Sequence, residues 1–600
     1  MEKSVLHYLL NGIVKGHGKI ALKSKQAQPL EPVEVDFIDK PASEKFTVGF
    51  HREVILPDDI DKKKYYIAGY GENNPARGVI DPQYAHAVWI DDNSQRGGIL
   101  LISLDVVGLL NKDVNKIREL LKGFSAQTCC RYIGVMSTHN HAGIDTMGIW
   151  GKLPFSGKDP KFMEVLFTAT IESCYEAYKN RRDGDLYLGT IEVPDMQEDI
   201  RTPIVYSKTL TRFRFLPADG STEVWLLNFA SHSESLQGCN HLVSADFPCY
   251  LREKIKAESG ADVVYTVGAV GGMISMDVPE EDKLRKEHRL LESTRKIGYK
   301  LADYALKITD EEKLQPVINY GRREFYARVE NTILTVACMV GLLEADRYAD
   351  KKYPKLMCLK TEISIFEIGN KKMLFLPCEI FPELVFGGFL SAEESATGNG
   401  GEVNPEILAD IVEDKNIMVC GLANDELGYV VPPNDFILNK TAPYLENARD
   451  KHNRRHYEET NSMSPYIAQE IAENVKVLYN DFIKYVMEMY YGETNEIARI
   501  FFFNNKKELL GKEIIGVGDV DSVSVSCRKV VELVLKYDAT GIVIAHNHPQ
   551  GFAVVSADDR KVTLDVKSAV NAIGAHLYDH LIFANNTYFS MRTDPEFVYM

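Results

Sequence analysis

Residues 545–551 read Ala-His-Asn-His-Pro-Gln-Gly, and residues 556–559 read Ser-Ala-Asp-Asp. The residues just before the first histidine are short, apolar and β-branched, which predicts a buried strand. Because successive side chains of a strand point to opposite faces, His546 and His548 share one face while Asn547 points away. The spacing therefore aims two imidazoles at one point.

A third metal ligand is available in the residues that follow. Ser556 begins an amphipathic helix, which places Asp559 in its first turn. Two histidines and a carboxylate, with a fourth position left to water, form the ligand set of catalytic zinc, which lowers the pKa of its bound water to about 7. The alternative is purely structural, because serine and aspartate are also residues that cap and begin helices.

The pattern H-x-H-x7-S-x-x-D resembles the motif of the JAMM metallopeptidases, and the flanking residues look like the RadC branch of that superfamily. The resemblance implies that zinc is held by His546, His548 and Asp559. It also implies a smaller α/β/α domain of the JAB/MPN type with a mixed sheet. The flanking residues that match the RadC branch are Arg528, Asp579, His580, Tyr588 and Ser590.

The same family needs a glutamate on an upstream strand, where it acts as general base on the zinc-bound water. The stretch that begins at Glu496 matches this part of the family, so Glu496 is the predicted base. Glu493, three residues earlier, is the alternative. Ser556 is then expected to steady the oxyanion or the water.

The composition is that of a globular chain whose main partner is not a polyanion. Hydrophobic residues make up 45% and charged residues 26% of the 600 residues, as in ordinary globular proteins. A net charge of -17 argues against nucleic-acid binding, because such binding depends on neutralising phosphates. The ten cysteines include no C-x-x-C pair, which favours reduced thiols over disulfides.

The sequence predicts a cytoplasmic protein without a membrane span. No stretch reaches the roughly 18 uninterrupted apolar residues that a span needs. The apolar patch at residues 1–16 is interrupted by His7 and Asn11, and no small-residue cleavage site follows it.

The order of the expected elements predicts an α/β domain with a largely parallel sheet. A strand at 99–104 is followed by an amphipathic helix at 111–121 and a second strand at 132–136, as in parallel α/β proteins. Residues 388–405 are rich in turn formers and predict a long mobile loop of the kind that acts as a lid. The expected parts of the chain are an N-terminal extension over residues 1–46, a hydrolase domain over residues 47–478 and a second domain over residues 479–600.

Four strand ends of the first hydrolase domain carry side chains that can bind a metal. Residues 137–143 read Ser-Thr-His-Asn-His-Ala-Gly after an apolar strand, so the two histidines share a face by the same alternation. Ligands of α/β sheets bind at the carboxyl ends of strands. A single histidine at a strand end is more often a buried core residue, so the argument depends on the whole set. The residues at the four strand ends are His139, His232, Glu379 and Tyr429.

This set resembles the neutral ceramidase family, which carries T-H-x-H-x-G, a histidine at a later strand end, a P-G-E turn and a G-L-A-N-x-x-x-x-Y segment. The resemblance implies that zinc is held by His139, His232, Glu379 and Tyr429. It further implies that His141 and Tyr457 bind the amide near the metal, as proton donor or oxyanion partner.

The chain departs from that family at two turns. Cys378 stands before the expected zinc-binding glutamate, where the family usually has glycine. The family's D-V-S-P turn reads Gly-Met-Ile-Ser at residues 272–275, so its serine, Ser275, is displaced by one position. The displacement favours direct attack by metal-bound water over attack by a serine.

Together the motifs predict a zinc-dependent hydrolase with two sites that act on C–N bonds. The C-terminal site is expected to cleave peptides or isopeptides, and the N-terminal site amides, with one zinc ion in each. The alternative is that only one module is an enzyme. The other, the RadC-like module in preference to the ceramidase-like one, is then a non-catalytic binding or DNA-repair-associated domain. The overall acidity of the chain speaks against a role on DNA.

Overall fold

The computed structural model describes most of the chain, and the described residues form two compact units. The first unit ends at Leu478, and the second begins at Tyr479. Most of the expected N-terminal extension lies outside the described residues, and so does Glu493. The described residues are Ala27, 34–36, 41–278, 288–350, Tyr353, 356–488, Tyr490, 495–505, 509–518, 525–549, 555–584 and 587–591.

The first unit contains a mixed sheet that has nine strands among its described residues. The predicted strand–helix–strand unit is present, because β4 (Ile99–Leu104) and β5 (Tyr132–Ser137) pair in parallel and α2 (Asn111–Leu120) lies between them in the sequence. β9 and β10 are also parallel, but the remaining neighbours are antiparallel. In spatial order the strands are β10 (Asp262–Val267), β9 (Val224–Phe229), β8 (Thr209–Pro217), β6 (Arg182–Glu192), β2 (Phe46–Val54), β3 (Tyr84–Asp91), β4 (Ile99–Leu104) and β5 (Tyr132–Ser137), and β12 (Glu311–Lys313) pairs with β6.

The α/β class is therefore confirmed, but the sheet is mixed rather than largely parallel. The strand–helix–strand unit read from the sequence occurs once more, where α5 (Phe247–Ser259) joins β9 to β10, but the rest of the sheet is not built in this way. β2 and β3, β3 and β4, and β8 and β9 are joined by segments without an α-helix, and strands joined in that way pair antiparallel.

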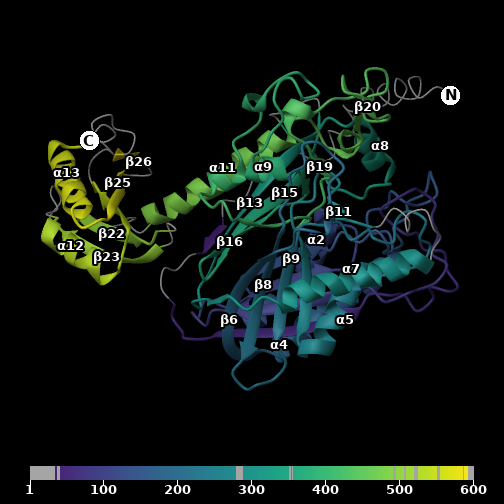
Figure 1. Ribbon diagram of the computed structural model, residues 1–600, viewed down its shortest axis with the longest axis horizontal. Coiled ribbons are helices and arrows are strands. Elements are labelled where there is room, and N and C mark those ends of the chain that lie inside the picture. Colours follow the sequence, from purple (N-terminus) through teal and green to yellow (C-terminus); the bar gives the residue numbers. More distant parts are fainter. Residues whose placement is uncertain are drawn as a thin grey trace. The chain divides into compact units, whose positions relative to one another are not determined.

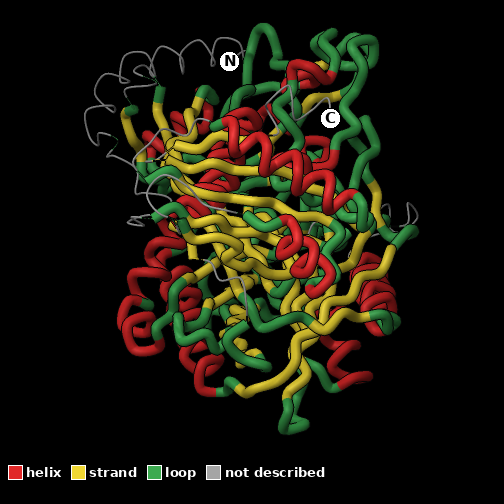
Figure 2. The backbone as a smooth tube through the Cα atoms, turned by 90° about the vertical axis from the view of Figure 1, so that its left-hand side faces the viewer, coloured by secondary structure: helices red, strands yellow, loops and turns green. Residues whose placement is uncertain are grey.

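The two faces of this sheet bury alternate residues against different layers (Figure 1 and Figure 2). Trp89 and Leu100 pack against helices, whereas Val88 and Leu101 face a second, six-stranded sheet. The strands of that sheet, counted among the described residues, are β1 (Glu34–Asp36), β13 (Ile318–Val329), β14 (Arg347–Ala349), β15 (Met357–Ile368), β16 (Lys371–Phe375) and β18 (Met418–Cys420).

Helices cover the outer faces of both sheets. α4 packs on β2 and β3, and α5 and α7 pack together over β10 and β8 (Figure 1). On the other side, Leu478 of α11 lies against Gly321 of β13, so the unit is layered helix, sheet, sheet, helix. The helices of this unit are α2 (Asn111–Leu120), α3 (Lys122–Thr128), α4 (Pro160–Lys179), α5 (Phe247–Ser259), α7 (His288–Leu306), α8 (Thr332–Val340), α9 (Pro382–Phe386), α10 (Leu408–Ile411) and the first part of α11 (Ile467–Glu488), which continues past Leu478 into the second unit.

The Gly-Leu-Ala-Asn segment at residues 421–424 connects the two edge strands of the nine-stranded sheet. Gly421 N donates to Val267 O of β10 over 3.0 Å, and Asn424 N donates to Val135 O of β5 over 2.7 Å. The Asn424 side chain, 1% exposed, also accepts from Val135 N at 2.9 Å and donates to the Tyr132 hydroxyl at 2.9 Å. The segment therefore fixes the strand end that leads to the first His-Asn-His.

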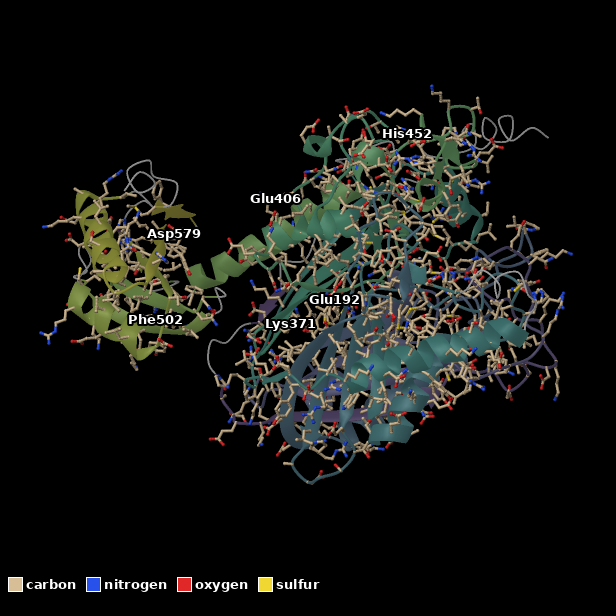
Figure 3. The ribbon with its side chains drawn as sticks, in the orientation of Figure 1. Glu192, Lys371, Glu406, His452, Phe502 and Asp579 are labelled. Atoms are coloured by element: carbon tan, nitrogen blue, oxygen red, sulfur yellow. The ribbon has the colours of Figure 1, made fainter. Side chains whose placement is uncertain are left out.

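The second unit is a five-stranded mixed sheet with two helices among its described residues. β22 pairs antiparallel with β23 and β24, β24 pairs parallel with β25, and β25 pairs antiparallel with β26. Phe502, labelled in Figure 3, is fully buried and stacks on Tyr537 with ring centroids 4.4 Å apart. The elements are β22 (Ile497–Phe503), β23 (Leu509–Val517), α12 (Cys527–Lys536), β24 (Gly541–Asn547), α13 (Ala557–Asn571), β25 (His576–Ala584) and β26 (Thr587–Ser590).

A helix that spans a lipid bilayer needs about 20 predominantly apolar residues. Within the described part of the chain, no helix is both long enough and apolar enough to span a membrane.

We predict that Asn424→Ala destabilises the first unit by about 1–3 kcal/mol, because it leaves the buried Val135 N–H without its partner and leaves the Tyr132 hydroxyl with only its hydrogen bond to Ser364 Oγ. Urea denaturation followed by tryptophan fluorescence measures the change. The exposed Asn115 of α2 provides the control, since Asn115→Ala is expected to stay within about 0.5 kcal/mol of wild type. Equal midpoints for the two variants would refute this role of the segment.

Candidate metal centres

In the first unit, two histidines that each follow the end of a strand are held by backbone carbonyls. His139 follows β5, and its Nδ1 lies 2.7 Å from Val107 O. His232 follows β9, and its Nδ1 lies 2.7 Å from Ile274 O. A carbonyl oxygen only accepts hydrogen bonds, so both Nδ1 atoms carry hydrogen. In the neutral rings, both Nε2 atoms therefore present lone pairs.

Those two Nε2 atoms meet the carboxylate of Glu379. Glu379 Oε2 lies 2.9 Å from His232 Nε2 and 3.1 Å from His139 Nε2. All three side chains are buried. Two lone pairs and a carboxylate oxygen this close repel one another unless a cation stands between them, and the candidates are a proton or a metal ion.

The pKa shifts of these residues also indicate that the group is stable only with a positive charge among them. Burial alone would raise the pKa of Glu379, but the two imidazoles hold it well below its usual range. Burial would lower the pKa of His232, yet its hydrogen bond to Glu379 raises that pKa to about 9. Without a metal, the site can be satisfied only by taking up a proton.

His141 stands beside this group and is clamped on several sides. Its Nε2 lies 3.3 Å from His139 Nε2, and its Nδ1 lies 3.3 Å from Glu234 Oε2. Gly69 packs under the ring so closely that a Cβ there would come 2.4 Å from His141 Cγ. The Tyr70 ring meets it edge-on with centroids 5.5 Å apart.

Glu234 was not identified from the sequence, although it lies at the centre of this clamp. It is 5% exposed and accepts a 2.8 Å hydrogen bond from the Tyr70 hydroxyl, and Ser275 Oγ donates to its other oxygen. The hydroxyl and imidazole contacts outweigh burial and lower the pKa of Glu234. Glu234 lies two residues after His232 but beyond the end of β9 at Phe229, so strand alternation gave no signal for it.

Tyr429 and Tyr457 lie beside the three central residues. β17 (Glu379–Ile380) pairs parallel with β19 (Tyr429–Val430), with Glu379 opposite Tyr429. The Tyr429 hydroxyl donates to Met273 Sδ at 3.2 Å. The Tyr457 ring lies 6.4 Å from that of Tyr429 and is 43% exposed. The structure thus brings His139, His232 and Glu379 into direct contact and leaves the two tyrosines at their edge.

The segment that carries Tyr457 is fixed by a buried ion network. Arg201, 6% exposed, pairs with Glu458, with Glu459 at 2.9 Å and with Asp435 at 3.0 Å. Burial raises the pKa of Glu458 despite the guanidinium beside it. Three carboxylates around one cation leave this network rich in negative charge next to the candidate site.

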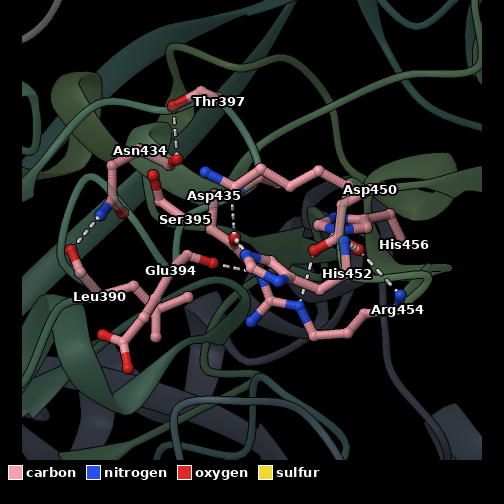
Figure 4. Close-up of polar contacts among 12 residues, drawn as sticks. Leu390, Glu394, Ser395, Thr397, Asn434, Asp435, Asp450, His452, Arg454 and His456 are labelled. Carbon is pink, nitrogen blue, oxygen red and sulfur yellow. Dashed lines mark hydrogen bonds and ion pairs between the residues drawn. The ribbon is translucent and has the colours of Figure 1, made fainter.

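The turn-rich loop at residues 388–405 is tied to the same region (Figure 4). Thr397 Oγ1 donates to the Asn434 carbonyl at 2.6 Å, and Arg454 Nη2 donates to the Glu394 carbonyl at 2.6 Å. The sequence predicted a mobile lid here and gave no sign of these anchors.

In the second unit, the predicted ligands also converge. His546 Nε2 lies 3.0 Å from His548 Nε2 and 3.0 Å from Asp559 Oδ1. His548 Nε2 lies 3.7 Å from Asp559 Oδ2. Asn547 points away, as predicted, and its side-chain oxygen accepts from Ile497 N at 2.8 Å.

Glu496 also reaches this group. Its Oε1 lies 3.7 Å from His546 Nε2, and it is 6% exposed. Glu496, His546 and His548 offer ligand atoms within 4.8 Å of one another, so the geometry alone leaves open which carboxylate is the third ligand.

The structural interpretation of Ser556 and Asp559 as a helix cap is confirmed, and it leaves room for the functional one. The two residues form a capping box at the start of α13, in which Ser556 Oγ accepts from Asp559 N at 3.0 Å. Ser556 N and Oγ both donate to Asp559 Oδ2, at 2.8 and 2.6 Å. The cap occupies Oδ2 and leaves Oδ1 toward His546. These contacts, with that histidine, outweigh burial and lower the pKa of Asp559.

His580 supports His546 from behind. His580 Nε2 lies 2.8 Å from His546 Nδ1, and His580 Nδ1 lies 2.6 Å from Thr563 Oγ1. Burial lowers the pKa of His580 to about 3, so its ring is neutral near pH 7. The sequence placed His580 in a family pattern but gave it no role.

The donor chemistry of both groups fits zinc. Each offers imidazole nitrogens and a carboxylate oxygen, the ligand types of catalytic zinc sites with an open position. Cysteine sulfur is absent from both groups, although Cys378 directly precedes Glu379.

Comparison with known proteins assigns the second unit. The sequence model of the family "RadC-like JAB domain" matches residues 478–596. A "UPF0758 protein" of Thermotoga maritima is 32% identical over 130 residues, which cover 22% of this chain and 56% of that protein. A "UPF0758 protein" of Carboxydothermus hydrogenoformans is 35% identical over 98 residues, which cover 16% of this chain and 43% of that protein. The chain thus spans only about half the length of these curated relatives.

The first unit has the fold of a different protein class. The crystal structure of neutral ceramidase from Pseudomonas aeruginosa superposes with a TM-score of 0.54 at 16% identity, covering 73% of this chain and 75% of that one. A structure titled "Ceramidase complexed with C2" gives a TM-score of 0.55 at 15% identity, covering 74% and 76%. The chain therefore joins an N-terminal unit with a ceramidase-like fold to a C-terminal RadC-like JAB domain.

Proposed function

We propose that this chain is a zinc-dependent hydrolase with two sites for C–N bonds, a JAMM-type peptidase site in the second unit and a ceramidase-like amidase site in the first. The observation that carries the proposal is common to both units. In each unit one histidine, His139 or His546, has its Nε2 about 3 Å from a carboxylate oxygen and from the Nε2 of another histidine, while its Nδ1 has a fixed partner. Zinc, when bound, acts as a Lewis acid and activates a water molecule.

In the second unit, His546, His548 and Asp559 would hold the ion. Glu496 is buried and lies 3.7 Å from His546 Nε2, where a general base can take a proton from the attacking water and return it to the leaving amine. Ser556 Oγ orients Asp559 and lies at the exposed side of the site, where it can steady an oxyanion.

In the first unit, His139, His232 and Glu379 would hold the ion, with Tyr429 completing the set after its hydroxyl turns from Met273. His141 is the proton carrier, because its Nε2 faces the ligands while Nδ1 faces Glu234. Tyr457 is exposed enough to meet the carbonyl of a bound amide.

The substrate classes follow from the two module types. A peptide or isopeptide suits the JAB-type site, and an acyl amide suits the ceramidase-like site. A membrane or a nucleic acid is not required for either reaction.

We predict two zinc ions in the intact chain and one in each site-directed double variant. His546→Ala with His548→Ala removes the second-unit ion, and His139→Ala with His232→Ala removes the first-unit ion. The two sets share no residue, and such independent sites behave additively. Metal analysis by mass spectrometry after zinc loading and gel filtration gives the count.

The exposed His576 is the control for that experiment, because His576→Ala keeps both ions. Hydrolysis of a fluorogenic short-chain N-acyl amide should survive in the second-unit double variant. If a folded double variant lost both ions, the interpretation as two separate sites would be wrong, and one composite site would take its place.

A matched pair of variants decides which second-unit carboxylate is the ligand. We predict that Glu496→Gln keeps the zinc and abolishes peptide hydrolysis. Asp559→Asn should weaken zinc binding by more than the roughly 10- to 100-fold that is lost when a residue supporting a ligand is removed. Chelator competition measures the affinity. The reverse pattern would make Glu496 the ligand.

We predict that Glu234→Ala lowers kcat for the N-acyl amide by about 100-fold while both zinc ions remain, since a misoriented proton carrier removes a gain of about 10²–10⁴. Glu119→Ala, on the exposed face of α2, is the control and keeps full activity. An unchanged kcat in Glu234→Ala would exclude His141 as the proton carrier.

A further inference from the structure

A chain of hydrogen bonds runs from helix α13 through β25 to the back of His546. Thr563 Oγ1 donates to the carbonyl of Asp559, four residues earlier on α13, at 2.5 Å. A hydroxyl has one hydrogen, and this one is committed to an oxygen that can only accept. Thr563 Oγ1 must therefore accept from His580 Nδ1, 2.6 Å away.

The direction of that bond determines the next one. With its hydrogen on Nδ1, the neutral His580 ring presents a lone pair at Nε2. His546 Nδ1, 2.8 Å away, must then donate to it. His546 is left with a lone pair on Nε2, the atom that faces His548 and Asp559 at 3.0 Å.

We propose that His580 and Thr563 are positioning residues that lock His546 in the tautomer able to bind zinc. The inference rests on the proposed zinc site of the second unit and assigns a role that none of its ligands supplies. Both residues are enclosed, with Thr563 0% and His580 2% exposed, so water does not compete for their hydrogen bonds.

The arrangement also links two ligands through one helix. Asp559 contributes its carboxylate to the site and its backbone carbonyl to the start of the chain, and Thr563 sits one turn later on the same helix. Asp579, labelled in Figure 3, precedes His580 on β25, and its carboxylate accepts from His580 N at 2.7 Å. The strand and the helix therefore hold His580 from both sides.

Glutamine and asparagine separate tautomer control from simple space filling. The terminal carbonyl of glutamine falls near the position of His580 Nε2 and can accept from His546, whereas that of asparagine falls near Nδ1 and cannot reach it. His580→Gln should therefore keep the lock and His580→Asn should break it. Thr563→Val keeps the shape of the threonine but removes the acceptor.

The test uses zinc itself as the probe, in the full chain carrying His139→Ala and His232→Ala so that only the second site is read. Chelator competition should show a roughly 10- to 100-fold loss of zinc affinity for His580→Ala and His580→Asn, a smaller loss for Thr563→Val, and affinity within about threefold of the parent for His580→Gln. Adding Thr563→Val to His580→Ala should cost nothing more, since the two act in series. His576→Ala, on the same strand, is the matched control.

A second readout reports the tautomer directly. Solid-state nitrogen NMR of histidine-labelled chain should show His546 protonated at Nδ1 in the parent and in His580→Gln, and this signal should be lost in His580→Asn. Equal zinc affinities for the glutamine, asparagine and parent forms would overturn the proposal while leaving the zinc site intact. Failure of the parent to bind zinc at all would overturn the proposed function together with it.

Discussion

A fixed acceptor on Nδ1 of a histidine is the interaction on which both candidate centres depend. Val107 O and Ile274 O play this part in the first unit, and His580 Nε2 plays it in the second. Each leaves a lone pair on Nε2, directed at a carboxylate and a second imidazole. The repulsion that results is relieved by a cation, and the folds of both units maintain the geometry that demands one.

The two units reach this geometry by different routes. In the first unit the candidate ligands come from strand ends far apart in the sequence, and residues 421–424 fasten the edge strand β5, which leads to His139. In the second unit a single strand end supplies both histidines, and the first turn of α13 supplies the carboxylate. The shared His-Asn-His tripeptide therefore reflects a common chemical solution in two unrelated sheets.

Local patterns in the sequence predicted much of this. Strand alternation correctly placed His546 and His548 on one face, and the cap residues correctly marked the start of α13. The mixed sheet was missed because one strand–helix–strand unit was extended to the whole domain, whereas strand order depends on pairings between distant segments.

The supporting residues could not be predicted in the same way. Glu234 contacts His141 and Tyr70, and His580 contacts His546 and Thr563, in each case across the fold. Such contacts leave no periodic signal, since each depends on where two separate elements come to lie. They nevertheless decide which nitrogen of each histidine faces the site.

Anomalous diffraction at the zinc absorption edge, on crystals of the intact chain grown with zinc, tests the central claim most directly. The account predicts two peaks, one within bonding distance of Nε2 of His139 and His232 and the other of Nε2 of His546 and His548, about 2.0–2.1 Å from each nitrogen. A single peak, or peaks bound to cysteine sulfur or to Nδ1 atoms, would contradict it.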